Sequence, residues 1–293
     1  MSAATPSSLP AERPGYPADD ELAARRLAAA GTEPDAVPGI AVVDGEVAGV
    51  PCRTLEVRGA TGQEVLVYLH GGGFRLGSPV AYTAFAGALV GAGVERIVLV
   101  DYRLAPEHPF PAGLRDALAV LAAVRSASGT GRVVLAGDSA GAGLALSAAL
   151  VARDEGLPVD GLVLLSPWLD LRCVSDTFTS PTNTDRMFPL DSARQAAETY
   201  LQGHRDDDPL VSPVLADVVG LPPTVVLVGT GESLIGDAAG LASRMARAGQ
   251  QVDLSVLPDA VHSWPVVTPD SPHTATTVAR IAHFVGHGCA ARP

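Results

Sequence analysis

Lysine is missing from the 293 residues, and all 20 basic residues are arginines. This absence excludes catalysis through a lysine Schiff base and phosphate binding by a P-loop lysine. Acidic residues outnumber the arginines and give a formal net charge of −12. Because a surface of this sign repels phosphate groups, nucleic acids and anionic membranes are poor candidates for partners.

Cysteine is scarce, with only Cys52, Cys173 and Cys289, and no Cys-x-x-Cys pair occurs. An odd count without that spacing argues against a disulfide framework or a zinc site and fits a reducing compartment. No apolar stretch reaches the length of a membrane span without charges or glycines. The first twenty residues also lack the apolar run of a signal peptide. We therefore expect a cytoplasmic protein.

The spacing of apolar runs predicts an α/β fold in one main domain. Strands are predicted at residues 40–43, 50–57, 65–69, 97–100, 133–135, 162–165, 225–228 and 252–257. Helices are predicted at residues 20–30, 114–124, 140–153 and 238–248. The first two strands flank a Gly-containing turn and suggest a hairpin. The alternation that follows implies parallel strands with helices on both faces of the sheet.

Two segments fall outside this alternation. Residues 1–38 are predicted to form an N-terminal arm and a cap helix, with the Pro- and Ser-rich residues 1–17 disordered or loosely docked. Residues 172–208 interrupt the strand–helix alternation with Pro, Asp, Thr and aromatic residues. A long insertion in an α/β core is usually a lid or a binding element, so we predict a cap there. The main domain would span residues 39–293.

The sequence Gly-Asp-Ser-Ala-Gly at residues 137–141 lies between a predicted strand and a predicted helix. This context is typical of a nucleophile elbow, where a strained turn lifts a Ser hydroxyl above the sheet and flanking glycines avoid Cβ clashes. An ordinary helix N-terminus capped by Ser139 would give the same five residues. Ser139 is thus a candidate nucleophile.

The sequence His-Gly-Gly-Gly-Phe at residues 70–74 follows the strand predicted at 65–69. Consecutive glycines let the backbone turn several amides inward, as the oxyanion of an acyl-transfer reaction requires. A phosphate loop is the competing interpretation, but it ends in Gly-Lys-Ser/Thr, and this chain has no lysine. The glycines at 141 and 143 also lack the third glycine of a dinucleotide fingerprint.

Two more motifs accompany these: Asp-Tyr-Arg-Leu-Ala-Pro-Glu-His-Pro-Phe-Pro-Ala at residues 101–112 and Ser-Pro-Trp-Leu-Asp at residues 166–170. The four motifs together resemble those of the hormone-sensitive-lipase-like α/β hydrolases, which are also called the bacterial family IV esterases. The resemblance extends from about residue 65 to the C-terminus. It implies an α/β-hydrolase fold, with a mostly parallel eight-stranded sheet, helices on both faces and a small helical cap. It places the oxyanion donors on the amides of Gly72, Gly73 and Ala140.

The same resemblance makes residues 101–112 a structural loop that supports the site. Asp101 and His108, both within this loop, would then have structural roles. Similar proteins are often dimers, so a homodimer is a further expectation. None of these proteins needs a metal or a cofactor for ester hydrolysis, and we expect neither here.

The base of a Ser-acid-His triad must follow the acid along this chain. His262 comes just after the strand predicted at 252–257, where a loop would emerge at the same sheet edge as Ser139. The competing imidazoles are those of His204, His273, His283 and His287. The last two share one face of the final helix with metal-ligand spacing, but the Glu and the third ligand are missing, which favours a surface pair. We predict His262 as the general base.

Three carboxylates compete for the remaining triad position. Glu232 occupies the first position of the acid-x-Leu element that the family carries after this strand, usually as Asp and sometimes as Glu. Gly236 stands where the family often has another acid. Asp237 should already lie in the following helix, and Asp259 would reach the base only through a local turn. We favour Glu232, whose role would be to hold the imidazole tautomer and to stabilise the imidazolium.

The predicted function is therefore hydrolysis of small to medium acyl esters through an acyl-enzyme. The candidates to line the substrate pocket are Phe74, Arg75, Trp168, Met187, Phe188 and Trp264. For each of them, packing in the core or lid is an equally good interpretation. A deacetylase, thioesterase, lyase or cyclase dedicated to a natural-product intermediate remains an alternative, as does a non-catalytic small-molecule receptor.

Overall fold

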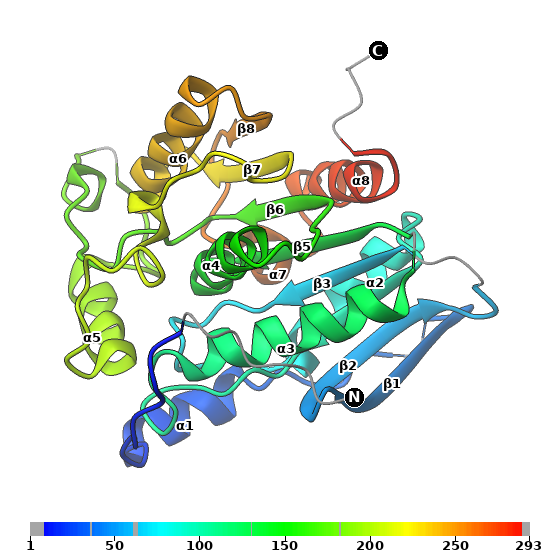
Figure 1. Cartoon of the computed structure of the whole chain (residues 1–293), viewed down its shortest axis with the longest axis horizontal. Coiled ribbons are helices and arrows are strands. Elements are labelled where there is room, and N and C mark those ends of the chain that lie inside the picture. Colours follow the sequence, from blue (N-terminus) through cyan, green and yellow to red (C-terminus); the bar gives the residue numbers. More distant parts are fainter. Residues whose placement is uncertain (1–8, 36, 61–63, 130, 182, 289–293) are drawn as a thin grey trace.

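The computed structural model describes residues 9–35, 37–60, 64–129, 131–181 and 183–288. In this part of the chain, eight strands form one sheet in the order β1-β2-β4-β3-β5-β6-β7-β8 (Figure 1). The strands are β1 (Ile40–Val47), β2 (Val50–Val57), β3 (Val65–Leu69), β4 (Arg96–Val100), β5 (Val133–Asp138), β6 (Gly161–Leu165), β7 (Thr224–Gly229) and β8 (Val252–Leu257). The predicted hairpin is confirmed, since β1 pairs antiparallel with β2, and β2 also runs antiparallel to β4. All other pairs are parallel.

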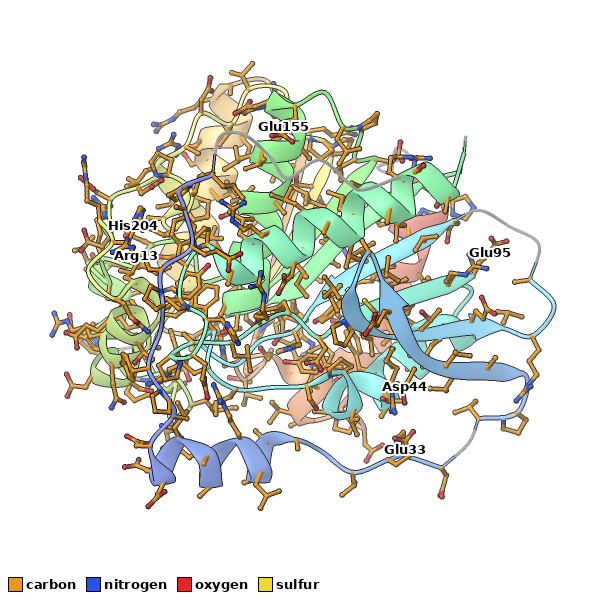
Figure 2. All side chains as sticks on the ribbon, turned by 60° about the horizontal axis from the view of Figure 1, so that its bottom comes forward. Arg13, Glu33, Asp44, Glu95, Glu155 and His204 are labelled. Atoms are coloured by element: carbon orange, nitrogen blue, oxygen red, sulfur yellow. The ribbon has the colours of Figure 1, made fainter. Side chains whose placement is uncertain are left out.

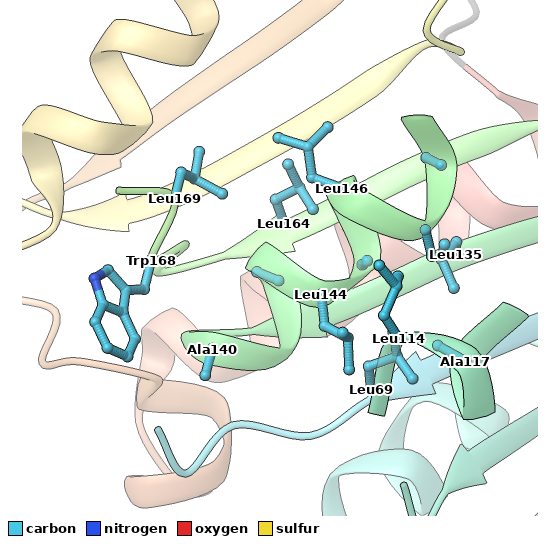
Figure 3. Packing of buried hydrophobic residues seen from close by; sticks show 14 of the residues in the cluster. Leu69, Leu114, Ala117, Leu135, Ala140, Leu144, Leu146, Leu164, Trp168 and Leu169 are labelled. Atoms are coloured by element: carbon cyan, nitrogen blue, oxygen red, sulfur yellow. The ribbon is translucent and has the colours of Figure 1, made fainter. Parts of the chain in front are cut away.

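Helices cover both faces of the sheet, as predicted. The first face packs against α3 (Ala112–Ala127), α4 (Ala140–Asp154) and α6 (Ile235–Arg247). The second face packs against α2 (Thr83–Gly91), α7 (Trp264–Val267) and α8 (Pro272–His287). Because strand side chains alternate, Val67 of β3 belongs to the first core and Leu66 to the second. Figure 3 shows part of the first core, where Leu144 of α4 is drawn beside Leu69 of β3 and Leu114 of α3.

Burial on both faces explains why the central strands are continuous apolar runs. Every residue of β3 and of β6 is buried. Short 3-10 turns connect other parts of the chain, at η1 (Pro79–Tyr82), η2 (Asp176–Phe178) and η3 (Pro213–Leu215). Among the described helices, none combines the length and the apolarity that crossing a bilayer requires.

The N-terminal arm is fastened to the main domain by hydrogen bonds. Its helix α1 (Asp20–Ala29) is capped by Asp19, whose carboxylate accepts a hydrogen bond from the Leu22 amide at 2.8 Å. Arg26 of α1 forms an ion pair with Glu107 at 2.6 Å. Figure 2 shows Arg13 of the arm beside His204, and their nitrogen atoms are 3.0 Å apart. Residues 9–17 are therefore docked, whereas residues 1–8 of the predicted loose segment lie outside the described residues.

In its described residues, the insertion at 172–208 carries one α-helix, α5 (Leu190–Leu201). In Figure 1 the arrowheads of β3, β6 and β7 point to the side of the molecule where α1 and α5 lie. Tyr200 of α5 stacks on Phe74 with ring centroids 3.9 Å apart, so the insertion contacts the predicted oxyanion loop directly. Ligands of open α/β sheets bind at the carboxyl ends of the strands. The insertion is thus placed where a cap over a site would be.

Candidate active site

Ser139 lies in a strained turn between β5 and α4. Its backbone has φ 51° and ψ −122°, a conformation that residues with a Cβ rarely adopt. A Cβ at position 137 would collide with the backbone of Gly141, and one at position 141 would collide with the Leu69 carbonyl. The Ser139 side chain makes no capping hydrogen bond. This geometry is that of a nucleophile elbow, and the alternative of an ordinary capped helix N-terminus is wrong.

Three buried side chains meet above this turn. The Ser139 hydroxyl oxygen lies 2.9 Å from Nε2 of His262, and Nδ1 of His262 lies 2.8 Å from Oε2 of Glu232. Their exposed fractions are 4%, 7% and 2% respectively. Glu232 follows β7, and His262 follows β8. Parallel strands therefore bring together residues that are 123 positions apart in the chain.

The second oxygen of Glu232 is held by two further donors. Oε1 accepts hydrogen bonds from the Gly229 amide at 2.6 Å and from the Ser166 hydroxyl at 2.9 Å. The Ser166 oxygen in turn accepts a hydrogen bond from the Ser263 amide at 3.1 Å. With Oε1 fixed by donors, Oε2 is oriented toward the imidazole. Ser166 was not singled out from the sequence, although it begins the Ser-Pro-Trp-Leu-Asp motif.

Neither competing carboxylate is hydrogen-bonded to His262 in the described part of the chain. Asp237 lies in α6, as the sequence predicted, and its Oδ2 accepts hydrogen bonds from the amides of Leu169 and Asp170 at 2.8 and 3.0 Å. Burial raises the pKa of Asp237 to about 7. Asp259 is exposed. Asp237 thus supports the loop after β6.

The other histidines are occupied elsewhere. Nε2 of His204 is 2.7 Å from Asp208, and His273 is a half-buried residue at the start of α8. The rings of His283 and His287 stack with centroids 4.7 Å apart on one helix face, as the sequence predicted. None of these imidazoles contacts Ser139 among the described residues.

Asp138, the residue before the candidate nucleophile, connects two loops of the site. Its carboxylate accepts hydrogen bonds from the Gly71 amide at 2.8 Å, from the hydroxyls of Tyr68 and Tyr82 at 3.1 and 3.0 Å, and from the Ser263 hydroxyl at 2.7 Å. Complete burial raises the pKa of Asp138, and these hydrogen bonds oppose the rise. Because one partner precedes the oxyanion glycines and another follows the imidazole, Asp138 fixes both loops relative to the sheet.

The predicted oxyanion loop presents unpartnered amides. Gly72 has φ 122°, and a Cβ there would collide with the Leu76 carbonyl, so this turn requires glycine. In the described residues the amides of Gly72 and Gly73 donate no backbone hydrogen bond. Ala140 is the first residue of α4, where amides lack intrahelical acceptors and the helix dipole is positive. These amides can therefore stabilise an anionic oxygen beside Ser139.

The loop at residues 101–112 supports these glycines, as the family resemblance implied. The Tyr102 hydroxyl donates to the His70 carbonyl at 2.7 Å, and the two rings stack with centroids 4.4 Å apart. Burial lowers the pKa of His70 to about 4, so this imidazole is neutral near pH 7 and packs as part of the wall. Asp101 and His108 are exposed, and neither is hydrogen-bonded to Ser139 or His262 among the described residues.

The pKa of His262 is set by opposing effects. Burial, the largest effect, lowers it, while the hydrogen bond and charge of Glu232 and the charges of Asp185 and Asp138 raise it, and the pKa lies above its ordinary value. Asp185 was not singled out from the sequence. Its carboxylate accepts hydrogen bonds from the amides of Met187, Phe188 and Ser233, at 2.9, 3.0 and 3.2 Å. It thereby attaches the insertion to the loop that carries Glu232.

Asp185, Glu232 and His262 also form a group whose potential ligand atoms lie within 4.8 Å of one another. The carboxylate oxygens of Asp185 are bonded to backbone amides, and Glu232 and His262 are bonded to each other. A metal would have to displace these hydrogen bonds. The donor set therefore fits a buried hydrogen-bonded chain better than a metal site.

Two cavities adjoin His262. One, of about 220 Å³, is lined by Ser139, by the two glycines of the predicted oxyanion loop, Gly72 and Gly73, and by Arg75, Met187 and Phe188. The other, of about 560 Å³, lies between residues 184–187 of the insertion and the loops that carry Glu232 and His262. Met187 and Val267 line both. Three of the predicted pocket residues are thus placed at a cavity that contains the candidate nucleophile.

The other three predicted pocket residues require a correction, because they are packed away from both cavities. Phe74 stacks on Tyr200, and its ring is 5.7 Å from that of Trp168. Trp168 is fully buried, and its indole nitrogen donates to the Asp170 carbonyl at 3.1 Å. Figure 3 shows its side chain in the core near Ala140. Trp264 is buried in the second core, where it donates to Thr277 at 3.1 Å.

The model of the alpha/beta hydrolase fold family matches residues 66–266. Solved structures with the same fold include EstE5 soaked with ethyl alcohol, which superposes with a TM-score of 0.86 at 31% identity and covers 94% of this chain and 93% of its own. A hormone-sensitive lipase from a metagenome library superposes with a TM-score of 0.85 at 33% identity, covering 92% and 93%. The chain belongs to the hormone-sensitive-lipase-like esterases of the α/β-hydrolase fold.

Curated relatives of this esterase carry names consistent with that family. An acetyl-hydrolase of Streptomyces hygroscopicus is 41% identical over 203 residues, which cover 68% of this chain and 67% of the relative. An esterase of Acinetobacter venetianus is 30% identical over 243 residues, which cover 80% of each chain. The family predicted from the four motifs is thereby confirmed, and with it the class of carboxylic-ester hydrolases.

Proposed function

We propose that this esterase hydrolyses small to medium acyl esters through an acyl-enzyme on Ser139, with His262 as general base and Glu232 as the acid of the triad. The observation that carries the proposal is the 2.9 Å contact between the Ser139 hydroxyl and Nε2 of His262. That nitrogen accepts the hydroxyl proton only if Nδ1 carries the ring proton. The carboxylate 2.8 Å from Nδ1 favours that tautomer.

The reaction then proceeds in two halves. As the Ser139 oxygen attacks the ester carbonyl carbon, its proton passes to Nε2 of His262, and the carbonyl oxygen becomes an oxyanion facing the amides of Gly72, Gly73 and Ala140. The tetrahedral intermediate collapses, the bond to the alcohol oxygen breaks, and His262 protonates that oxygen. Water repeats the sequence on the acyl-enzyme, which releases the carboxylic acid and restores the Ser139 hydroxyl.

The size of the cavity beside Ser139 supports small substrates. Pockets for drug-sized ligands usually measure about 300–1,000 Å³, whereas this cavity measures about 220 Å³. The name of the Streptomyces relative points in the same direction, since an acetyl-hydrolase removes the smallest of these acyl groups. We therefore propose acetyl to butyryl esters as the first substrates to test. A homodimer remains a hypothesis, which sedimentation would test.

The test combines a variant with a covalent probe. Ser139→Ala should lower kcat for 4-nitrophenyl acetate by a factor on the order of 10⁴ or more, as removal of a triad member does in other hydrolases. A fluorophosphonate should label the wild-type protein at Ser139 and leave the variant unlabelled. Near-normal turnover by the variant would overturn the mechanism. A folded wild-type protein that resists the probe would instead favour the receptor or lyase alternatives.

A further inference from the structure

Arg75 is a buried cation without a partner in the cavity that contains Ser139. Only 5% of its surface is exposed, and its Nε is buried without a hydrogen-bond partner in the described residues. It follows the oxyanion glycines and lines the same cavity. A Cβ built on Gly73 would lie 3.9 Å from Nε of Arg75, so the guanidinium lies close to this glycine.

Among the described residues, no carboxylate acts as a counter-charge to Arg75. Burial lowers the pKa of Arg75, and the positive charge of Arg25 lowers it further, with a weak opposing effect of Tyr16. Asp138 is the one acidic residue among those described as lining this cavity, and its carboxylate already accepts four hydrogen bonds. Burying a guanidinium without an anion and hydrogen-bond acceptors costs free energy, and Arg75 has no such compensation at Nε among the described residues.

Two other arginines of the chain show how a guanidinium with a structural role is compensated in this fold. Arg53 is about equally buried, at 6% exposed, and forms ion pairs with Asp44 and Glu33 at 2.7 Å each. Arg26 pairs with Glu107 through both terminal nitrogens, at 2.6 and 2.7 Å. Both of these arginines therefore fasten one segment to another through carboxylate partners. Arg75 differs because its missing partner would have to come from a molecule in the cavity.

We propose that Arg75 binds an anionic group, a carboxylate or a phosphate, on the ester substrate. The proposal rests on the hydrolysis proposed above and specifies its substrate class. Arg25 of α1 lines the same cavity and is exposed, so its charge would attract an anion to the entrance. Met187, Phe188 and Val266 supply the apolar wall for the uncharged part of the molecule. A planar guanidinium suits both anions, because its N–H groups match the oxygens of carboxylate and phosphate.

The experiment compares each anionic ester with a neutral counterpart. The first pair is the mono-4-nitrophenyl ester of adipic acid and 4-nitrophenyl hexanoate, which have acyl chains of equal length. The wild-type enzyme should give a kcat/KM ratio of anionic to neutral ester of about 10 or more, as expected for one charge-assisted contact. Arg75→Met should reduce this ratio at least about tenfold. Arg247→Gln, which removes an exposed arginine that lines neither cavity, should keep the wild-type ratio.

Two more pairs locate the anion and identify its chemistry. The butyrate ester of 4-hydroxybenzoate is compared with that of methyl 4-hydroxybenzoate, and the butyrate ester of 4-hydroxyphenyl phosphate with phenyl butyrate. A preference that depends on Arg75 for either pair places the anion on the alcohol side of the substrate. If the wild-type enzyme prefers no anionic ester in any pair, the proposal about Arg75 is overturned. Continued hydrolysis of the neutral esters and labelling of Ser139 would show that the proposed function still stands.

Thermal stability distinguishes an arginine that binds a ligand from one that only stabilises the fold. Because Arg75→Met removes an uncompensated buried charge, the Tm of the free variant should equal or exceed that of the wild type. Adipate should raise the Tm of the wild type and leave that of the variant unchanged. A Tm that falls in the variant, together with an unchanged substrate ratio, would assign Arg75 to the structure and contradict the proposal.

Discussion

Replacing Glu232 by Gln is the substitution that tests the triad with least change in shape. Oε1 of Glu232 accepts hydrogen bonds from the Gly229 amide and from the Ser166 hydroxyl, while Oε2 lies 2.8 Å from Nδ1 of His262. A Gln side chain has only one acceptor oxygen. Two donors demand that oxygen at the Oε1 position, so the amide NH₂ group must face His262.

This orientation reverses the hydrogen bond to the imidazole. An NH₂ donor beside Nδ1 stabilises the tautomer with the proton on Nε2, and a protonated Nε2 is unable to accept the Ser139 proton. The comparable Asp-to-Asn change in another serine hydrolase lowers kcat by about 10⁴ through the wrong tautomer. At roughly 1.4 kcal/mol per factor of ten, the expected loss of transition-state stabilisation is about 5 kcal/mol.

The assay is the steady-state hydrolysis of 4-nitrophenyl acetate by folded, active-site-titrated protein. Glu232→Asp keeps the charge and shortens the side chain, so it should lose less activity than the Gln variant. Asp237→Asn serves as the control for a buried carboxylate in the same region, and its kcat/KM should stay within a few fold of the wild type. If Glu232→Gln retained more than about a tenth of the wild-type kcat, the assignment of Glu232 as the triad acid would be refuted.

Three further predictions follow from the surroundings of the site. Since His262 must be neutral and its pKa is raised, kcat/KM should fall on acidification with a midpoint above about 6.5; a flat profile between pH 5 and 9 contradicts a His base. Burial raises the pKa of Asp237 to about 7. Between about pH 4 and pH 7, Asp237 is therefore protonated in the folded protein and ionised in the unfolded chain, so the free energy of unfolding should decline as the pH rises toward 7. Asp237→Asn should therefore gain Tm relative to the wild type at pH 8 and not at pH 4; equal differences at both values argue against this linkage. Asp138→Asn places an NH₂ group among the four donors that the carboxylate accepts from, so it should lower both kcat and the free energy of unfolding, the latter by roughly 1–3 kcal/mol. An unchanged midpoint of denaturant unfolding would show that the four-donor arrangement is not needed.

The sequence was informative where local residues determine local geometry. The nucleophile elbow needs glycines on both sides of Ser139 and an apolar strand before it, and all of these lie within a few residues. The predicted end of β5 was nevertheless three residues too early, because Ala136, Gly137 and Asp138 have low strand propensity. They continue the strand because β6 pairs with all three and β3 pairs with the first two, which is information that the local sequence lacks.

Residues whose environment depends on distant elements were harder to predict. Trp168 and Trp264 are aromatic residues near the predicted motifs, but each is buried by residues far away in the chain. Trp168 packs against Phe74 and Phe188, and Trp264 is bonded to Thr277 of α8. Asp185 belongs to no motif and reaches the site because the insertion folds back over β7. The helix α5 did leave a signal, since Leu190, Ala193, Ala197 and Leu201 are spaced at helical intervals after Pro189.

Direct detection of the acyl-enzyme is the measurement closest to the central claim. The enzyme is mixed with excess 4-nitrophenyl butyrate, quenched in acid during turnover, and examined by intact-mass and peptide-mapping mass spectrometry. The account predicts a mass gain of one butyryl group, located on Ser139 and absent in Ser139→Ala. Turnover without a covalent adduct, or an adduct on another residue that survives in the variant, would contradict it.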